Sequence, residues 1–158
     1  NRNRGEATEY HENLARSHFI IVLERYPDYS PALVALAESS VRSLRMEEAA
    51  ATYERLLKLN PGEAEQWYTY AEVLSYLQKL PEAEGAFEEV LRIDPLYFDA
   101  HARIGAIRLA QKDYAEAVRR FELFLAAAPR SDMAPLTREL LEEARAKAKK
   151  QKESPLNR

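Results

Sequence analysis

The sequence predicts an all-α protein built from helix pairs that stack on one another. Four short phrases recur at one fixed interval: LERYP, LKLNP, LRIDP and LAAAP, which end at Pro27, Pro61, Pro95 and Pro129. Between these prolines, apolar residues return every three or four positions, which is typical of helices, and no segment keeps the alternation of a strand. Because one helix pair cannot bury its own apolar stripe, neighbouring pairs must stack into a continuous core.

Other positions follow the same period as the prolines, which makes it an internal repeat. An alanine stands twelve residues before each proline, and an aromatic residue stands eight before it. The alanine column is Ala15, Ala49, Ala83 and Ala117, and the aromatic column is Phe19, Tyr53, Phe87 and Phe121. Small residues also recur in the first helix of each pair, at Ala37, Ala71 and Gly105, where we expect two backbones to approach closely.

The chain divides into elements in order from its N-terminal end. Residues 1–7 are expected to be a disordered or tag-like start, because they lack a repeat pattern. Residues 6–26 show no turn signal, which predicts one long helix, so 8–29 form a half repeat or an N-terminal cap. Asn1 in place of Met suggests a fragment or a processed product.

Three full repeats follow, each with a first helix, a turn and a second helix. They cover residues 30–63, 64–97 and 98–131. Ser30 and Pro31 form a favourable helix start, an N-cap followed by a proline in the first turn. Ser131 is expected to cap a final helix over 132–152, and 153–158 are expected to be a disordered tail.

These columns resemble the tetratricopeptide repeat family, whose pattern is a Trp, a Leu-Gly pair, a central Ala, an aromatic residue and a closing Pro over about 34 residues. The middle repeat carries the pattern as Trp67, Tyr70-Ala71, Ala83, Phe87 and Pro95, and the next as Ile104-Gly105, Ala117, Phe121 and Pro129. One column departs, because the family often has tyrosine where this chain has Ser40, Leu74 and Arg108. The resemblance implies a solenoid of antiparallel helix pairs with an N-terminal helix and a C-terminal capping helix.

Composition narrows the classes of function. The chain has 158 residues, 46% of them hydrophobic and 31% charged, which predicts a folded protein. It has no cysteine, so disulfides and thiol chemistry are excluded. No apolar run approaches the ~20 residues that span a bilayer. The net charge of −3 gives no support to nucleic-acid binding. Nothing in the composition separates cytoplasm from periplasm.

We expect no catalytic residue, metal or cofactor. His11 and His18 share a helix face and lie near Glu12, but a surface helix explains them better than a metal site. His101 stands in the tryptophan column, where we expect a packed imidazole and not a catalytic base. No phosphate-binding loop, nucleophile elbow or HExxH motif is present.

The C-terminal end is basic. Residues 138–158 carry seven Lys or Arg and four Asp or Glu, a net charge of +3, which leaves −6 for the rest of the chain. Arg145, Lys147, Lys149, Lys150 and Lys152 provide most of this charge. We interpret them as a solvated helix end favoured by the helix dipole, with contact to an anionic partner as the alternative.

The resemblance places peptide binding in a groove lined by the first helices. The groove residues it selects are Glu38, Arg42, Tyr68, Thr69, Glu72, Tyr76, Arg103 and Leu109. With Glu65 and Asp99 added, the charged groove positions sum to −2. Tyr68 and Tyr76 would supply large contact area at low entropic cost, and we favour this role over the alternative that they only cover the surface of the first helices.

The same columns disfavour two known modes of binding. Relatives that hold the acidic tails of heat-shock chaperones use a Lys/Asn/Asn/Lys/Arg clamp. This chain has Val34, Glu38, Thr69, Asp99 and Arg103 there. The asparagine ladder of other relatives would fall at Ala35, Thr69 and Arg103, and is absent.

The sequence therefore predicts a non-catalytic interaction module, an adaptor or assembly scaffold. Its partner would be a peptide or helix that is apolar or aromatic with some positive charge. One alternative is a regulatory or substrate-docking segment of a larger enzyme. Another is a scaffold that assembles with copies of itself.

Overall fold

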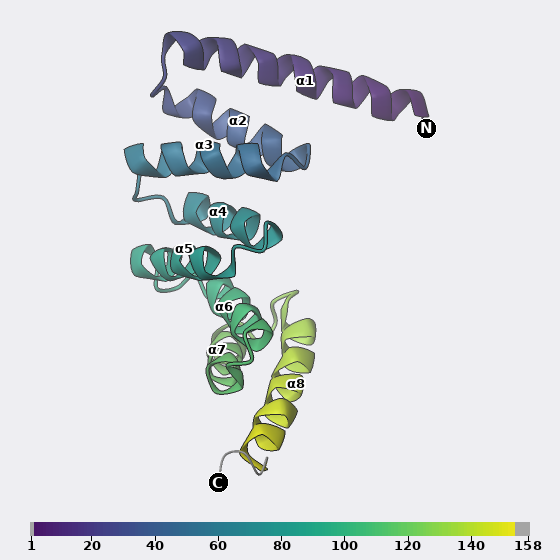
Figure 1. The fold of residues 1–158 in the computed structure, drawn as a ribbon, viewed down its shortest axis with the longest axis vertical. Helices are drawn as coiled ribbons and strands as arrows, with labels where there is room; N and C mark the ends of the chain where they lie inside the picture. The colour runs from purple at the N-terminus through teal and green to yellow at the C-terminus, as the bar shows by residue number, and fades with distance from the viewer. Residues whose placement is uncertain (1, 154–158) are drawn as a thin grey trace. The chain divides into compact units, whose positions relative to one another are not determined.

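The structure, a computed structural model, describes residues 2–153, and side chains from residue 11 onward; within that range every regular element is an α-helix (Figure 1). The helices of this part of the chain are α1 (Arg2–Arg25), α2 (Ser30–Arg42), α3 (Met46–Leu59), α4 (Ala64–Tyr76), α5 (Leu80–Ile93), α6 (Asp99–Ala110), α7 (Tyr114–Ala127) and α8 (Ala134–Glu153). The chain divides into two compact units, Asn1–Ala86 and Phe87–Arg158, which are described separately.

Each expected repeat contains one helix pair. The pairs α2–α3, α4–α5 and α6–α7 fall within residues 30–63, 64–97 and 98–131. The closing prolines follow the ends of the second helices, and side chains satisfy several of their carbonyl groups. Arg55 donates to the Pro27 oxygen at 2.6 Å, Trp67 Nε1 to the Pro61 oxygen at 2.9 Å, and Arg138 to the Pro129 oxygen at 2.7 Å.

Both ends of the chain differ from the expected boundaries. α1 is one long helix that starts at Arg2, whereas the sequence analysis placed a disordered or tag-like start at residues 1–7. α8 runs from Ala134 to Glu153, one residue into the expected tail. Residue 1 and residues 154–158 lie outside the described part of the chain. Ser131 precedes α8 and accepts a hydrogen bond from the Met133 N–H at 3.2 Å.

The start of α2 also differs in detail. Ser30 is its first helical residue, and Tyr29 takes the N-cap position without a side-chain cap. The Ser30 hydroxyl instead accepts a hydrogen bond at 2.7 Å from the Asn60 amide, which lies at the end of α3. The serine therefore links the two ends of one repeat instead of capping its own helix.

The turn inside each repeat has the same backbone geometry. Leu44, Gln78 and Lys112, which hold equivalent positions in the three repeats, have positive φ angles of 56°, 59° and 65°. In the first of these turns the Arg45 N–H bonds the Ser40 oxygen and the Leu44 N–H bonds the Val41 oxygen, and the other two turns repeat this pair. This pattern is the Schellman motif, which ends a helix through one left-handed residue.

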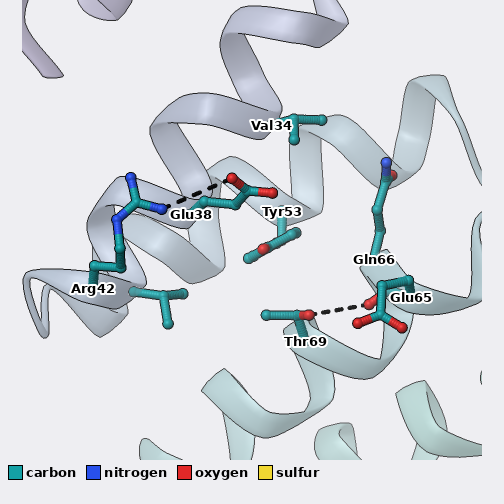
Figure 2. A pocket seen from close by; sticks show the side chains of 8 residues that line it. Val34, Glu38, Arg42, Tyr53, Glu65, Gln66 and Thr69 are labelled. Atoms are coloured by element: carbon teal, nitrogen blue, oxygen red, sulfur yellow. Dashed lines mark hydrogen bonds and ion pairs between the residues drawn. The ribbon is translucent and has the colours of Figure 1, made fainter. Parts of the chain in front are cut away.

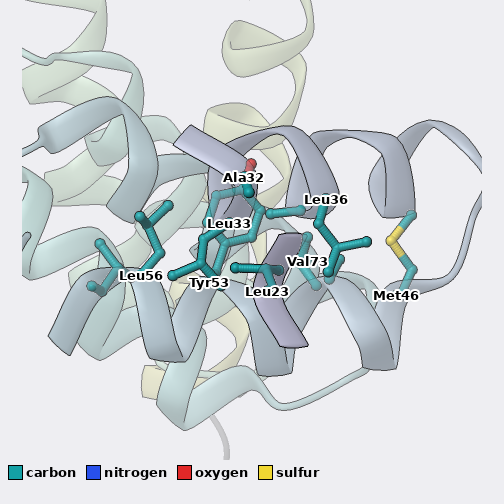
Figure 3. Close-up of a cluster of buried hydrophobic side chains, with 11 residues drawn as sticks. Leu23, Ala32, Leu33, Leu36, Met46, Tyr53, Leu56 and Val73 are labelled. Carbon is teal, nitrogen blue, oxygen red and sulfur yellow. The ribbon is translucent and has the colours of Figure 1, made fainter. Parts of the chain in front are cut away.

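The first unit has a hydrophobic core between α1, α2, α3 and α4 (Figure 3). Its fully enclosed side chains include Leu33, Ala37, Ala49 and Leu56, each 0% exposed. The alanine and aromatic columns are thus buried where a complete repeat surrounds them. In α1 the equivalent residues Ala15 and Phe19 are less completely buried.

The core of the second unit lies between α6, α7 and α8. Ala117 and Phe121 of α7 pack with Leu141 and Ala144 of α8. A smaller cluster joins Phe124 to Ala102 and Ala134. α8 therefore covers the last helix pair, as a capping helix does in repeat proteins.

The column in which the family often has tyrosine is filled differently in the first repeat. The Ser40 hydroxyl is buried, donates to the Leu36 oxygen at 2.8 Å and contacts Glu48 Oε2 at 3.1 Å. Arg16 of α1 donates to the same carboxylate oxygen at 2.9 Å, which lowers the pKa of Glu48. A polar network thus joins α1, α2 and α3 at a position that a large aromatic ring would otherwise occupy.

Among residues 2–153, no helix combines the length and the apolar composition needed to cross a membrane.

Candidate functional site

A hollow of about 260 Å³ lies between α2 and α4 in the first unit (Figure 2). Its lining side chains come from three helices. They are Val34, Glu38, Val41 and Arg42 of α2, Tyr53 of α3, and Glu65, Gln66 and Thr69 of α4.

Helical periodicity places these residues on one face. Val34, Glu38 and Arg42 are four residues apart, so their side chains line up along α2. On the opposite side of the same helix, Leu33 and Leu36 are buried in the core. The burial of that stripe turns Glu38 and Arg42 toward the hollow.

Tyr53 forms the floor of the hollow. Figure 2 shows its ring between Glu38 on one side and Thr69 on the other, and the side chain is only 4% exposed. Burial raises the pKa of Tyr53, and the negative charge of Glu38 raises it further, so the phenol stays protonated. The floor is therefore a largely buried ring that carries a neutral hydroxyl group.

The walls carry an excess of negative charge. Arg42 lies 3.9 Å from a carboxylate oxygen of Glu38, and its Nε lies 3.7 Å from Glu12 of α1. Arg42 thus divides its charge between two carboxylates, and Glu65 adds a third on the facing wall. The Thr69 hydroxyl donates to the backbone oxygen of Glu65 at 3.1 Å, so this bond does not use the Glu65 carboxylate.

The structure brings together three of the groove residues that the sequence selects. Glu38, Arg42 and Thr69 line the hollow. Glu72 and Tyr76 lie on α4 outside the lining, and Tyr76 is 61% exposed. Arg103 and Leu109 lie on α6 in the second unit.

Tyr68 does not stand on the groove wall. It is 9% exposed, which is less than the sequence led us to expect for a tyrosine on the groove wall. Ala102, one repeat later in the same column, is 4% exposed, which shows that this column is covered in both first helices. Of the two groove tyrosines that the sequence selects, Tyr76 is therefore the one exposed to solvent.

Sequence reasoning placed Tyr53 in the core and missed its role in the hollow. A signal was present, because the aromatic column has phenylalanine at the other three positions, Phe19, Phe87 and Phe121. A hydroxyl in an otherwise phenylalanine column indicates a polar neighbourhood. Gln66 carried no comparable signal.

His101 of α6 contacts an arginine of α7. Its Nδ1 lies 3.3 Å from Arg120 Nη1, and Arg120 also binds Glu116 Oε1 at 2.6 Å and the carboxylate of Glu88. Burial and then the positive charge of Arg120 lower the pKa of His101. The imidazole is therefore a neutral acceptor that ties α6 to α7. Of the residues that the structure describes, no three His, Cys, Asp or Glu side chains gather in a way that could hold a metal ion.

The comparison with known families decides the assignment. The family model described as "Tetratricopeptide repeat" matches residues 13–64 and 68–132. The chain belongs to the tetratricopeptide repeat family. Its helix pairs, closing prolines and Schellman turns are those of an all-α solenoid of this family.

Individual relatives agree with the family assignment. The chain is 33% identical over 87 residues to the tetratricopeptide repeat domain-containing protein PYG7, chloroplastic, of Arabidopsis thaliana. That match covers 55% of this chain but 29% of the relative. The chain thus spans less than a third of the length of this curated relative.

Solved structures share the fold. The crystal structure of MamA protein superposes with a TM-score of 0.74 at 18% identity, covering 93% of this chain and 84% of that chain. The first tetratricopeptide domain of Spaghetti (RPAP3), bound to the HSP90 peptide SRMEEVD, has a TM-score of 0.67 at 21% identity over 74% of this chain and 93% of that chain.

Proposed function

We propose that the chain is a non-catalytic protein-interaction module, an adaptor or assembly scaffold, that binds a peptide or helix in the hollow between α2 and α4. The observation that carries the proposal is the hollow itself, in which side chains of two successive first helices face each other over Tyr53. Tyr53 belongs to the core and Val34 and Val41 pack on it, whereas Glu38, Arg42 and Glu65 are exposed around the hollow, so the core does not require these three charged side chains there.

The chemistry of the hollow supports a partner with some positive charge. Glu38 and Glu65 exceed Arg42 in charge, and Arg42 is already engaged with Glu12 outside the lining. Val34, Val41 and the ring of Tyr53 provide apolar contact. A Lys or Arg beside an aliphatic or aromatic residue therefore complements the surface.

The same residues argue against an acidic chaperone tail. The peptide SRMEEVD of the similar HSP90-peptide complex carries two glutamates and an aspartate. Three positions of the Lys/Asn/Asn/Lys/Arg clamp fall inside the hollow, and this chain has Val34, Glu38 and Thr69 there. A carboxylate tail would meet repulsion where a clamp needs cations or amides.

A displayed peptide library tests this proposal. Selection on the wild-type chain is expected to enrich sequences with Lys or Arg next to aromatic or aliphatic residues. Counter-selection uses a Thr69→Lys chain, in which the new side chain fills the hollow and adds positive charge. Enrichment of acidic sequences, or of sequences that survive the counter-selection unchanged, would contradict the proposed site.

A second candidate is a docking segment within a longer protein. The PYG7 relative is more than three times as long as the part that matches, since the match covers 29% of it. In that case the hollow would present a substrate or regulator to another domain. Sequencing the complete reading frame tests this directly: a catalytic domain on the same chain supports the docking role, and its absence contradicts it.

A further inference from the structure

A second hollow, of about 390 Å³, lies in the second unit at the turn between α6 and α7. Its lining consists of three lysines and two side chains that can form hydrogen bonds, a tyrosine and a glutamine. The residues are Lys112, Tyr114, Lys147, Lys150 and Gln151. It shares no residue with the hollow between α2 and α4, and nothing in the proposed peptide binding uses it.

Three parts of the fold bring these side chains together. Lys112 is the left-handed residue of the last Schellman turn, with φ 65°, and Tyr114 is the first residue of α7. α8 packs on α7 through Leu141 and Ala144. This packing carries the next turns of α8, with Lys147 and Lys150, to the α6–α7 turn.

The charge at this hollow is only partly neutralised. Lys147 Nζ donates to Glu143 Oε1 at 2.5 Å. Within residues 11–153, no carboxylate forms an ion pair with Lys112 or Lys150. Three ammonium groups and one carboxylate therefore leave a net charge of about +2 around a concave surface.

A neighbouring hollow on the other side of α8 provides a contrast. It is lined by Ala115, Val118, Arg145, Ala148, Lys149 and Lys152. Arg145 binds Glu122 and Glu142 at 2.9 and 2.7 Å, and Lys149 lies 4.0 Å from Glu153. Apart from Lys152, the rest of that lining is aliphatic, and none of its side chains has a hydroxyl group. The helix dipole accounts for cations on both sides of α8, but it does not account for a tyrosine and a lysine from the α6–α7 turn converging on one side.

We propose that the hollow formed by Lys112, Tyr114, Lys147 and Lys150 binds a phosphate monoester group carried on a segment of a partner protein. Such a group carries a charge of about −1.5 to −2 at neutral pH, which matches the net charge of the hollow. Its oxygens accept hydrogen bonds from ammonium groups and from the Tyr114 hydroxyl. A single carboxylate would leave about one positive charge unmatched.

The surroundings favour a protein-borne group over a lipid surface. Membrane-binding helices pair their cations with large apolar side chains on an adjoining face. On the described part of α8, the large hydrophobic residue exposed to solvent is Leu136, near the opposite end of the helix. The described part of the basic end, up to residue 153, therefore has no large exposed apolar side chain that could act as an anchor.

The test uses the full chain and a short peptide with one phosphoserine flanked by alanine and glycine. The same peptide with serine, and with glutamate, gives the comparison, and binding is measured by isothermal titration calorimetry at low and at physiological salt. The phosphoserine peptide is expected to bind at least about tenfold more tightly than either comparison peptide, because serine has no charge and a phosphate group has more negative charge and one more acceptor oxygen than the glutamate carboxylate.

Two double variants locate the site. Lys112→Asn with Lys150→Gln removes two charges from the hollow, and asparagine tolerates the positive φ of residue 112. Lys149→Gln with Lys152→Gln removes two charges from the other side of the same helix. The first variant is expected to weaken binding at least about tenfold and the second by no more than about twofold, since specific contacts outweigh screened surface charge.

Each remaining outcome would overturn the proposal. Equal loss in both variants would show diffuse electrostatic attraction without a site. Equal binding of the glutamate peptide would show that phosphate is not distinguished. Tighter binding to vesicles that contain phosphatidylserine than to the phosphopeptide would assign the basic end to a membrane surface. No detectable binding of the phosphopeptide by wild type would leave the cations as a solvated helix end.

Discussion

At the scale of single residues, two glycines in helices have opposite roles. A Cβ built on Gly105 would lie 2.6 Å from both Cδ1 and Cε1 of Phe121, whose ring is 0% exposed. A Cβ on Gly85 would meet no heavy atom within 4 Å, and Gly85 is exposed on α5. The first glycine is required by close packing of two helices, and the second is not.

Gly105→Ala is therefore expected to destabilise the protein, and Gly85→Ala to stabilise it. Overpacking costs about 1–3 kcal/mol and exceeds the gain in helix propensity of about 1 kcal/mol at residue 105. At residue 85 only the gain in propensity remains, about 0.5–1 kcal/mol. Urea unfolding of both variants measures whether each substitution lowers or raises the free energy of unfolding. A stabilising Gly105→Ala would show that α6 and α7 pack less closely than the structure has them.

The backbone conformation of Leu44 lowers the stability of the protein. Its φ is 56°, in the left-handed region, and its side chain is 68% exposed, so little packing offsets the strain. Leu44→Gly is expected to raise the free energy of unfolding by about 1 kcal/mol, because an L side chain in this region costs about 1–2 kcal/mol. Thermal unfolding of the variant measures this change in stability. Leu59→Gly is the control, because Leu59 is exposed but helical, and a glycine there is expected to destabilise the protein.

At the same scale, the limits of sequence reasoning are visible in two tyrosines. The small-residue and aromatic columns could be predicted, since Ala49, Ala83, Ala117, Phe87 and Phe121 are all 0% exposed. The hollow depends instead on which side chains of α2, α3 and α4 meet in space. Tyr53 of the core lines the hollow, whereas Tyr68 does not line it. No pattern of residues within a single helix distinguishes these two tyrosines.

At the scale of elements, the repeat period predicted most of the helices. The hydrogen bonds of the turns explain where the first helices end and why α1 is not interrupted. The first helices end at Arg42, Tyr76 and Ala110, which are equivalent positions of the three repeats, through equivalent Schellman turns. No glycine marks these turns, so their positive φ could not be predicted from composition. α1 continues back to Arg2 because no such turn interrupts it.

The second unit contains a hydrogen-bonded cluster of charged side chains on α7. Glu116 accepts hydrogen bonds from Arg119 at 2.6 Å and from Arg120 at 2.6 Å, and these lower its pKa from 4.5 to about 2. A carboxylate whose pKa is lowered by folding stabilises the native state above its ordinary pKa. This contribution is lost as the pH falls from about 4.5 to about 2.

Glu116→Gln is expected to reduce stability at neutral pH by up to about 1 kcal/mol, the range for partly exposed ion pairs within one helix. The difference from wild type should shrink as the pH falls below 4.5, the ordinary pKa of the group. Urea unfolding at several pH values measures this difference. Glu82→Gln, one repeat earlier, is the matched control. A difference that stays constant down to pH 2 would show that the cluster contributes by packing alone.

At the scale of the whole molecule, the basic C-terminal end and the more acidic remainder are separate surfaces. The hollow between α2 and α4 lies in the first unit, and the basic hollow at the α6–α7 turn lies in the second. Their ligands are expected to have opposite charge. Binding at the first should therefore survive loss of Lys112 and Lys150, and binding at the second should survive loss of Glu38 and Glu65.

The central claim is that the hollow between α2 and α4 selects peptides with positive charge. The most direct measurement is the affinity of a library-selected peptide, by surface plasmon resonance, for the wild-type chain and two double variants. Glu38→Gln with Glu65→Gln alters this hollow; Glu47→Gln with Glu54→Gln removes the same charge from a different hollow of the first unit. The first should weaken binding about tenfold, mainly through slower association, and the second should change it little, because complementary charge near the site sets the encounter rate. Equal weakening by both variants, or binding of SRMEEVD as tight as that of the selected peptide, would contradict the account.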